Sequence, residues 1–145
     1  MNTEVEILLA EDTMSDAEMT IRAIRKSKIE NRIIHVKDGK EAMDFLTGVG
    51  AYAGRDINHK PKVILLDLKM PKINGMEVLG LIRKNEFLKD IPVVVLTSSK
   101  EDPDIERCYA LGVNSYIVKP VDYEQFMKVV SDLGLYWLVH NQSAS

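Results

Sequence analysis

Short apolar runs alternate with amphipathic stretches along most of the chain. Five runs have the length and composition of buried strands, at residues 5–10, 33–36, 63–66, 92–96 and 116–118. After each run, apolar residues recur at the three- and four-residue spacing of a helix with one buried face. This repeated alternation predicts an α/β fold, in which right-handed crossovers join parallel strands and helices cover both faces of the sheet.

Polar residues mark where the predicted helices begin. The expected N-terminal caps are, in chain order, Asp16 or Ser15, Asp38, Asn74 and Asp122. Gly112 suits the C-terminal end of the fourth helix. The last amphipathic stretch, residues 123–137, is the longest of the predicted helices.

One segment and the C-terminal tail lack this regularity. Residues 48–61 contain three glycines and no periodicity, which predicts a long loop between the second helix and the third strand. Loops of this length are often functional or mobile. Residues 141–145 are polar and are expected to be a disordered tail. We therefore predict a single domain over residues 1–145, with a core from about residue 5 to 140.

Composition restricts the class of protein. The chain is 46% apolar and 28% charged, as in ordinary soluble domains, and its net charge of -3 offers no electrostatic attraction for nucleic acid. Its single cysteine, Cys108, cannot form an intramolecular disulfide and fits a reducing compartment. The first apolar run ends at Glu11, too early for a secretion signal or a membrane span. We predict a cytoplasmic protein that binds neither membrane nor nucleic acid.

Polar side chains follow four of the predicted strands. Glu11 and Asp12 come after the first, Asp67 after the third, Thr97 after the fourth and Lys119 after the fifth. In a doubly wound sheet the carboxyl ends of the strands share one edge, where ligands bind. We expect these five side chains to meet there.

Their chemistry indicates metal-assisted phosphoryl transfer. Three carboxylates in one crevice repel each other unless a cation lies among them, and an all-oxygen ligand set suits Mg²⁺ or Mn²⁺. A metal, a lysine and a hydroxyl can together neutralise a transferring phosphoryl group. Asp67 is the best placed nucleophile because it stands between the acidic pair and Thr97 and Lys119, and its product would be an aspartyl phosphate.

Simpler interpretations exist for each residue taken alone. Asp12 could cap a helix, Asp67 could end a strand at a turn, and Lys119 could be a solvated charge. Tyr116 is equally consistent with a core aromatic residue and with a side chain that changes rotamer. The combination of carboxylates with Lys119 favours a functional site.

In this order, the motifs resemble the receiver domain of two-component response regulators, the family of the bacterial chemotaxis receiver. The resemblance rests on Glu11-Asp12, the pattern D-x-x-x-P-x-x-x-G formed by Asp67, Pro71 and Gly75, Thr97, Tyr116 and Lys119-Pro120. It implies a flavodoxin-like receiver fold with five parallel strands in the order 2-1-3-4-5.

The resemblance also implies a metal site and a phosphoryl acceptor. Asp67 would accept a phosphoryl group from a sensor histidine kinase or a phosphotransfer protein. Asp12 would bind Mg²⁺ directly and Glu11 through water, with Asp67 and the backbone carbonyl of Lys69 as the remaining protein ligands. The lysine at position 69 departs from the small or neutral residue of many receivers, at a position that tunes hydrolysis of the aspartyl phosphate.

The remaining implied roles concern the response to phosphorylation. Lys119 would pair with the phosphoryl oxygens, and its peptide bond to Pro120 would be cis. Thr97 would move toward the phosphoryl group and Tyr116 would swing inward. The surface of the fourth helix, fifth strand and fifth helix would then change and act on an unknown downstream protein.

Weaker similarities concern the subfamily. The long loop at residues 48–61, the segment 104–116 and the terminal Tyr136-Trp137-Leu138 resemble stand-alone response regulators associated with phytochromes. That subfamily implies a phytochrome-like histidine kinase as partner and a homodimer.

Two enzyme-like alternatives share the predicted architecture. One is a Mg²⁺-dependent phosphatase, which would need a second acid near Asp67 where this chain has Lys69. The other is a flavodoxin-like cofactor binder, whose phosphates Glu11 and Asp12 would repel. A receiver that never takes phosphate is disfavoured by the intact acceptor set. We therefore expect a switch that catalyses at most its own phosphorylation and dephosphorylation, rather than an enzyme.

Overall fold

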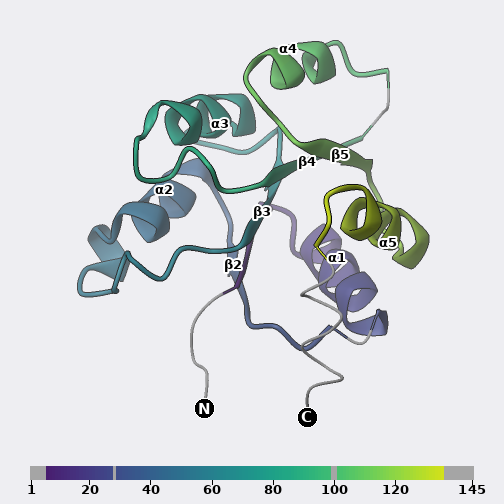
Figure 1. The fold of residues 1–145 in the computed structure, drawn as a ribbon, viewed down its shortest axis with the longest axis horizontal. Helices are drawn as coiled ribbons and strands as arrows, with labels where there is room; N and C mark the ends of the chain where they lie inside the picture. The colour runs from purple at the N-terminus through teal and green to yellow at the C-terminus, as the bar shows by residue number, and fades with distance from the viewer. Residues whose placement is uncertain (1–5, 28, 99–100, 136–145) are drawn as a thin grey trace.

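A computed structural model describes residues 6–27, 29–98 and 101–135, which form one parallel five-stranded sheet in the order β2-β1-β3-β4-β5 (Figure 1). The strands are β1 (Ile7–Ala10), β2 (Ile33–Val36), β3 (Val63–Asp67), β4 (Val93–Thr97) and β5 (Ser115–Val118). The helices are α1 (Met14–Lys26), α2 (Gly39–Thr47), α3 (Gly75–Lys84), α4 (Asp104–Ala110) and α5 (Tyr123–Asp132). The predicted fold class and strand order are confirmed.

The sheet separates two layers of helices. Along β1, the alternate residues Leu8 and Ala10 belong to a core cluster shared with α2, α3 and α4. Ile7 and Leu9 point to the other face and pack with α1 and α5. Figure 1 shows α2 and α3 on one side of the sheet and α1 and α5 on the other. Burial on both faces explains why the strands read as continuous apolar runs.

Most of the predicted helix ends are confirmed. Asp38, Asn74 and Asp122 each accept a hydrogen bond from the backbone N–H three residues later. Gly112, with φ of +93°, follows Leu111, the C-cap residue of α4. The prediction for α1 was wrong, because its N-cap is Thr13, which makes no side-chain capping bond.

The last helix is shorter than predicted. It ends at Asp132 after 10 residues, so α1, with 13, is the longer helix within the described ranges. Gly134 has φ of +68°, a left-handed conformation that a continuing helix cannot accommodate. Trp137 and the predicted tail at residues 141–145 lie outside the described residues, and the single-domain assignment for residues 1–145 stays a prediction.

The predicted loop at residues 48–61 is packed against α2. A short 3₁₀ helix, Gly50–Tyr52, places the Tyr52 ring edge-on to Phe45, with 5.1 Å between ring centroids. The Arg55 guanidinium lies 3.9 Å from the centroid of the same Phe45 ring. These contacts give the loop a structural role in covering Phe45. They indicate no further function for it.

The loop between β3 and α3 folds closely around the end of β3. A Cβ atom at Gly75 would collide with the backbone carbonyl of Asp67, so only glycine fits at this position. The Gly75 N–H donates a hydrogen bond of 2.9 Å to the Leu68 carbonyl. This close packing is the physical reason for the glycine of the D-x-x-x-P-x-x-x-G pattern. Among the described residues, no helix is both long and apolar enough to cross a membrane.

Candidate functional site

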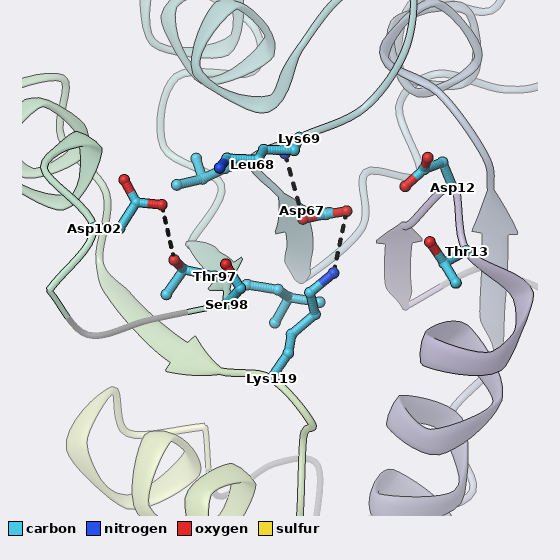
Figure 2. A pocket seen from close by; sticks show the side chains of 10 residues that line it. Asp12, Thr13, Asp67, Leu68, Lys69, Thr97, Ser98, Asp102 and Lys119 are labelled. Carbon is cyan, nitrogen blue, oxygen red and sulfur yellow. Dashed lines mark hydrogen bonds and ion pairs between the residues drawn. The ribbon is translucent and has the colours of Figure 1, made fainter.

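A cleft of about 230 Å³ opens at the carboxyl edge of the sheet (Figure 2). Its lining comes from the ends of β3 and β4 and from the segments that follow β1, β3, β4 and β5. The lining residues are Asp12, Thr13, Asp67, Leu68, Lys69, Leu96, Thr97, Ser98, Asp102 and Lys119. Sequence analysis had placed five of these, namely Asp12, Asp67, Lys69, Thr97 and Lys119, in one site, and the structure brings them together.

Three carboxylates converge beside this cleft. Glu11, Asp12 and Asp67 each offer an oxygen, and these oxygens lie within 4.8 Å of one another. Glu11 is fully buried and Asp67 is 4% exposed, whereas Asp12 is open to solvent. The donor set contains only oxygen, so it fits a hard cation such as Mg²⁺ or Mn²⁺.

The crowding of the carboxylates changes the pKa of Glu11. Burial raises the pKa of Glu11 from 4.5 to about 7, reinforced by its hydrogen bond with Asp67 and by the Asp67 charge. Lys119 and the Thr13 N–H, which donates to Glu11 Oε2 at 3.3 Å, act in the opposite direction. The crowded carboxylates therefore favour either a proton on Glu11 or a cation between them.

Lys119 reaches into this acidic group from the end of β5. Its ammonium lies 3.4 Å from Asp67, 3.2 Å from Glu11 and 3.1 Å from Asp16. Burial alone would lower the pKa of Lys119, but the carboxylates Asp67, Asp16 and Glu11 raise it above its ordinary value. The lysine is therefore a fixed positive charge in the site.

Asp16 is a site residue that sequence analysis assigned wrongly. It was expected to cap α1, but its carboxylate instead binds Lys119. The signal available in the sequence was an acidic residue in the first turn of a helix that begins at the site edge.

Thr97 ends β4, and its hydroxyl donates to Asp102 Oδ2 at 3.2 Å (Figure 2). Asp102 also accepts from the Asp104 N–H at 2.9 Å, where α4 begins. Sequence analysis missed Asp102. The Asp102-Pro103 pair is a helix-start signal that could have drawn attention to it.

Backbone features fix the immediate surroundings of Asp67. The Lys69 N–H donates to Asp67 Oδ1 at 3.4 Å, and the Lys69 side chain is exposed. The Lys119 N–H donates to the Thr97 carbonyl at 2.7 Å, and the Lys119–Pro120 peptide bond is cis, as predicted.

Tyr116 lies apart from the cleft. It is half-buried on β5 and packs edge-on against Tyr109 of α4, with ring centroids 6.5 Å apart. It also contacts the core cluster on that face of the sheet. The ring therefore connects β5 to α4.

The comparisons with known proteins agree with this geometry. The model of the response regulator receiver domain matches residues 7–131. The chain belongs to the response regulator receiver family. Receiver domains of this family are generally signalling switches rather than enzymes.

Individual relatives cover nearly the whole chain. The probable methanogenesis regulatory protein FilR2 of Methanothrix harundinacea is 42% identical over 94% of this chain and 86% of its own length. The solved structure of the bacteriophytochrome response regulator RtBRR is 49% identical, with a TM-score of 0.83 over 88% of this chain and 76% of that one.

Two further solved structures carry ligand or modification information. The phosphorylated cyanobacterial phytochrome response regulator RcpA is 38% identical, with a TM-score of 0.76 over 94% of this chain and 95% of that one. The Mn²⁺-bound form of response regulator Rcp1 is 39% identical, with a TM-score of 0.74 over 93% and 94% of the two chains. A receiver homologue has thus been solved with a divalent cation, and another in a phosphorylated state.

Proposed function

We propose that this chain is a phosphoacceptor switch in which Asp67 accepts a phosphoryl group from a sensor histidine kinase in the presence of Mg²⁺. The observation that carries the proposal is the placement of the Lys119 ammonium 3.4 Å from Asp67 in a cleft that the Thr97 side chain also lines. The arrangement supplies a nucleophile, a cation and a hydroxyl within one small space.

The transfer follows from these positions. A carboxylate oxygen of Asp67 attacks phosphorus while the bond from phosphorus to the donor's imidazole nitrogen breaks, and the electron pair leaves with the imidazole. Lys119 balances charge on the phosphoryl oxygens. Glu11, Asp12, Asp67 and the Lys69 carbonyl would hold Mg²⁺, which when bound supplies further positive charge for those oxygens.

The proposed response begins at Thr97. Its hydroxyl donates to Asp102 and must leave that acceptor in order to donate to a phosphoryl oxygen. Because Asp102 also binds the first turn of α4, this exchange offers a route to that helix. Tyr116, which packs on Tyr109, would follow by swinging inward.

The signalling surface proposed here consists of α4, β5 and α5. Large apolar side chains are exposed on it at Tyr109 of α4 and Tyr123 of α5, and beside it at Leu111, as expected of a surface that meets a protein partner. We propose that it contacts a downstream protein, and that the chain is cytoplasmic and forms a homodimer. Residues 136–138, which motivated the dimer, lie outside the described residues.

The proposed kinase is phytochrome-like, because relatives described as phytochrome response regulators share 38–49% identity with this chain. FilR2, at 42% identity, is described as a methanogenesis regulator, so similarity alone does not restrict the kinase to phytochromes. Transfer from a purified phytochrome-type kinase tests this part separately. Transfer from a chemotaxis-type kinase at an equal rate would contradict it.

Acetyl phosphate tests the central proposal. With Mg²⁺, intact mass should show one phosphoryl group on the wild type and none on Asp67→Asn. Asp38→Asn is the matched control because Asp38 is equally buried, 4% exposed, and asparagine still caps a helix. It should accept phosphate as the wild type does. Absence of phosphoprotein in the wild type, or its persistence in Asp67→Asn, would contradict the proposal.

The same samples separate a switch from a phosphatase. A switch should release little more than one phosphate per chain in the time that its own phosphoryl group persists. Rapid multiple turnover of a phosphate ester unrelated to acetyl phosphate would indicate an enzyme instead. Light scattering of the phosphorylated and unphosphorylated protein tests the dimer, and a monomer in both states would refute it.

A further inference from the structure

The ammonium of Lys119 is held by carboxylates from two directions, the strand ends and α1. It donates hydrogen bonds to Glu11 at 3.2 Å and to Asp16 at 3.1 Å, and it forms an ion pair with Asp67 at 3.4 Å. Asp67 and Glu11 belong to the acidic group at the ends of the strands. Asp16 comes from the first turn of α1 and makes the shortest of the three contacts, at 3.1 Å.

The position of Asp16 differs from that of Asp67. Asp67 and Lys119 both line the cleft, whereas Asp16 is not among the lining residues. The Asp16 carboxylate therefore attracts the ammonium toward α1 rather than toward the cleft. The carboxylate does not cap α1 either, since Thr13 is the N-cap.

We propose that Asp16 is a positioning residue that competes with an incoming phosphoryl group for the ammonium of Lys119. This inference rests on the proposed phosphoacceptor function. A phosphoryl oxygen at Asp67 is a further acceptor on the cleft side of the ammonium, so an approach of the ammonium to it weakens a contact on the other side.

Burial decides which of the two hydrogen bonds, to Glu11 or to Asp16, is weakened. The side chain of Glu11 is fully buried, and a buried acceptor that loses its partner is left without water. The side chain of Asp16 is 33% exposed, so water can replace the lysine there. Asp16 also brings negative charge close to the place where phosphorylation adds more. Both effects oppose phosphoryl binding, and removal of the Asp16 charge should relieve both.

Beryllofluoride, which mimics a phosphoryl group on an aspartate, is the probe. Its affinity is measured by calorimetry at saturating Mg²⁺, and the affinity for Mg²⁺ alone is measured separately. Asp16→Asn should bind beryllofluoride about fivefold more tightly than the wild type, the upper end for a partly exposed ion pair. Asp16→Ala should show at least as large an effect, and Asp16→Glu should return toward the wild type.

Glu18→Gln is the matched control, because Glu18 is exposed on the same helix and the change removes the same charge. It should leave the beryllofluoride affinity unchanged. If Asp16 had only a structural role, its substitution would weaken the binding of both beryllofluoride and Mg²⁺. Competition predicts instead that the substitution strengthens the binding of beryllofluoride alone.

Two results would overturn the inference by itself. One is unchanged or weaker beryllofluoride binding in both Asp16→Asn and Asp16→Ala. The other is equal tightening in Glu18→Gln, which would mean that only net charge matters. A wild type that binds Mg²⁺ but not beryllofluoride would overturn the proposed function, and this inference with it.

Discussion

Asp38 and Asp67 are equally buried aspartates, each 4% exposed, and each follows or ends a parallel strand. Asp38 accepts a 2.8 Å hydrogen bond from the Glu41 N–H and lies 3.5 Å from the Lys72 ammonium. Asp67 shares the ammonium of Lys119 with other carboxylates. Burial therefore does not distinguish a structural acid from a reactive one, and the partners of each carboxylate do.

The electrostatics of the two regions have opposite signs. Burial alone would raise the pKa of Asp38, but the Glu41 N–H and Lys72 bring it below its ordinary value. Beside Asp67, burial and the neighbouring carboxylate raise the pKa of Glu11 to about 7. The folded structure thus favours the ionised form of Asp38 at the start of α2. It disfavours the ionised form of Glu11 in the acidic site.

The largest expected effect is on the pH dependence of stability without Mg²⁺. Between pH 4.5 and about 7 folded Glu11 holds a proton that the unfolded chain has released, so raising the pH destabilises the fold. The loss should be up to about 3 kcal/mol. In urea unfolding, the unfolding free energy of Glu11→Gln should equal that of the wild type near pH 5 and exceed it near pH 8.

Asp38 should make stability change with pH in the opposite direction in the same experiment. Its lowered pKa contributes stability that is complete above its ordinary value of 3.8 and is lost as the pH falls below it. Asp38→Asn should therefore reduce the loss of unfolding free energy as the pH falls below about 4. The pH dependence of the unfolding free energy between pH 5 and 8 should stay unchanged. If Glu11→Gln and Asp38→Asn altered the pH dependence of stability over the same pH range, the contrast between the two regions would be wrong.

Substitution by alanine should change the unfolding free energy differently at Asp38 and at Asp67 at neutral pH. Asp38→Ala removes a helix cap and an ion-pair partner, and it should cost about 2 kcal/mol of unfolding free energy. Asp67→Ala removes one member of a repelling group and should cost nothing or stabilise by about 1 kcal/mol. Urea midpoints measured at pH 7.5 without divalent cations check this. A larger loss for Asp67→Ala would show that Asp67 supports the fold.

The smallest expected effect is stabilisation by Mg²⁺. At ten times its dissociation constant the cation should add about 1.4 kcal/mol, because it binds only the folded site. The effect should be larger at pH 8 than at pH 6, since Glu11 must lose its proton before it can bind a cation. Thermal unfolding with and without Mg²⁺ measures it. Asp12→Asn should abolish the shift, and Asp38→Asn should keep it.

Much of this molecule could be predicted because its signals are local. The apolar runs and the caps at Asp38, Asn74 and Asp122 depend on a few neighbouring residues, and all of them were confirmed. The parallel topology then brings the strand ends to one edge, which is why Asp67, Thr97 and Lys119 could be expected at one cleft.

The errors arose where a side chain chooses between a local and a distant partner. Asp16 is a plausible helix cap by sequence, yet it binds Lys119, which lies more than a hundred residues away in the chain. The end of the last helix at Asp132 depends on the left-handed conformation of Gly134. A helical apolar pattern that continues past a glycine does not reveal where the helix stops.

The sequence by itself determined the strands, most of the helices, the sheet and the residues at its carboxyl edge, because periodicity and parallel topology are enough to place them. Only the tertiary structure decided which carboxylates share Lys119, that Thr97 donates to Asp102, and that Glu11 is buried while Asp12 is exposed. The physical reason is that an ion pair or hydrogen bond depends on distances of a few ångströms between elements. Such distances arise only when the helices pack against the sheet.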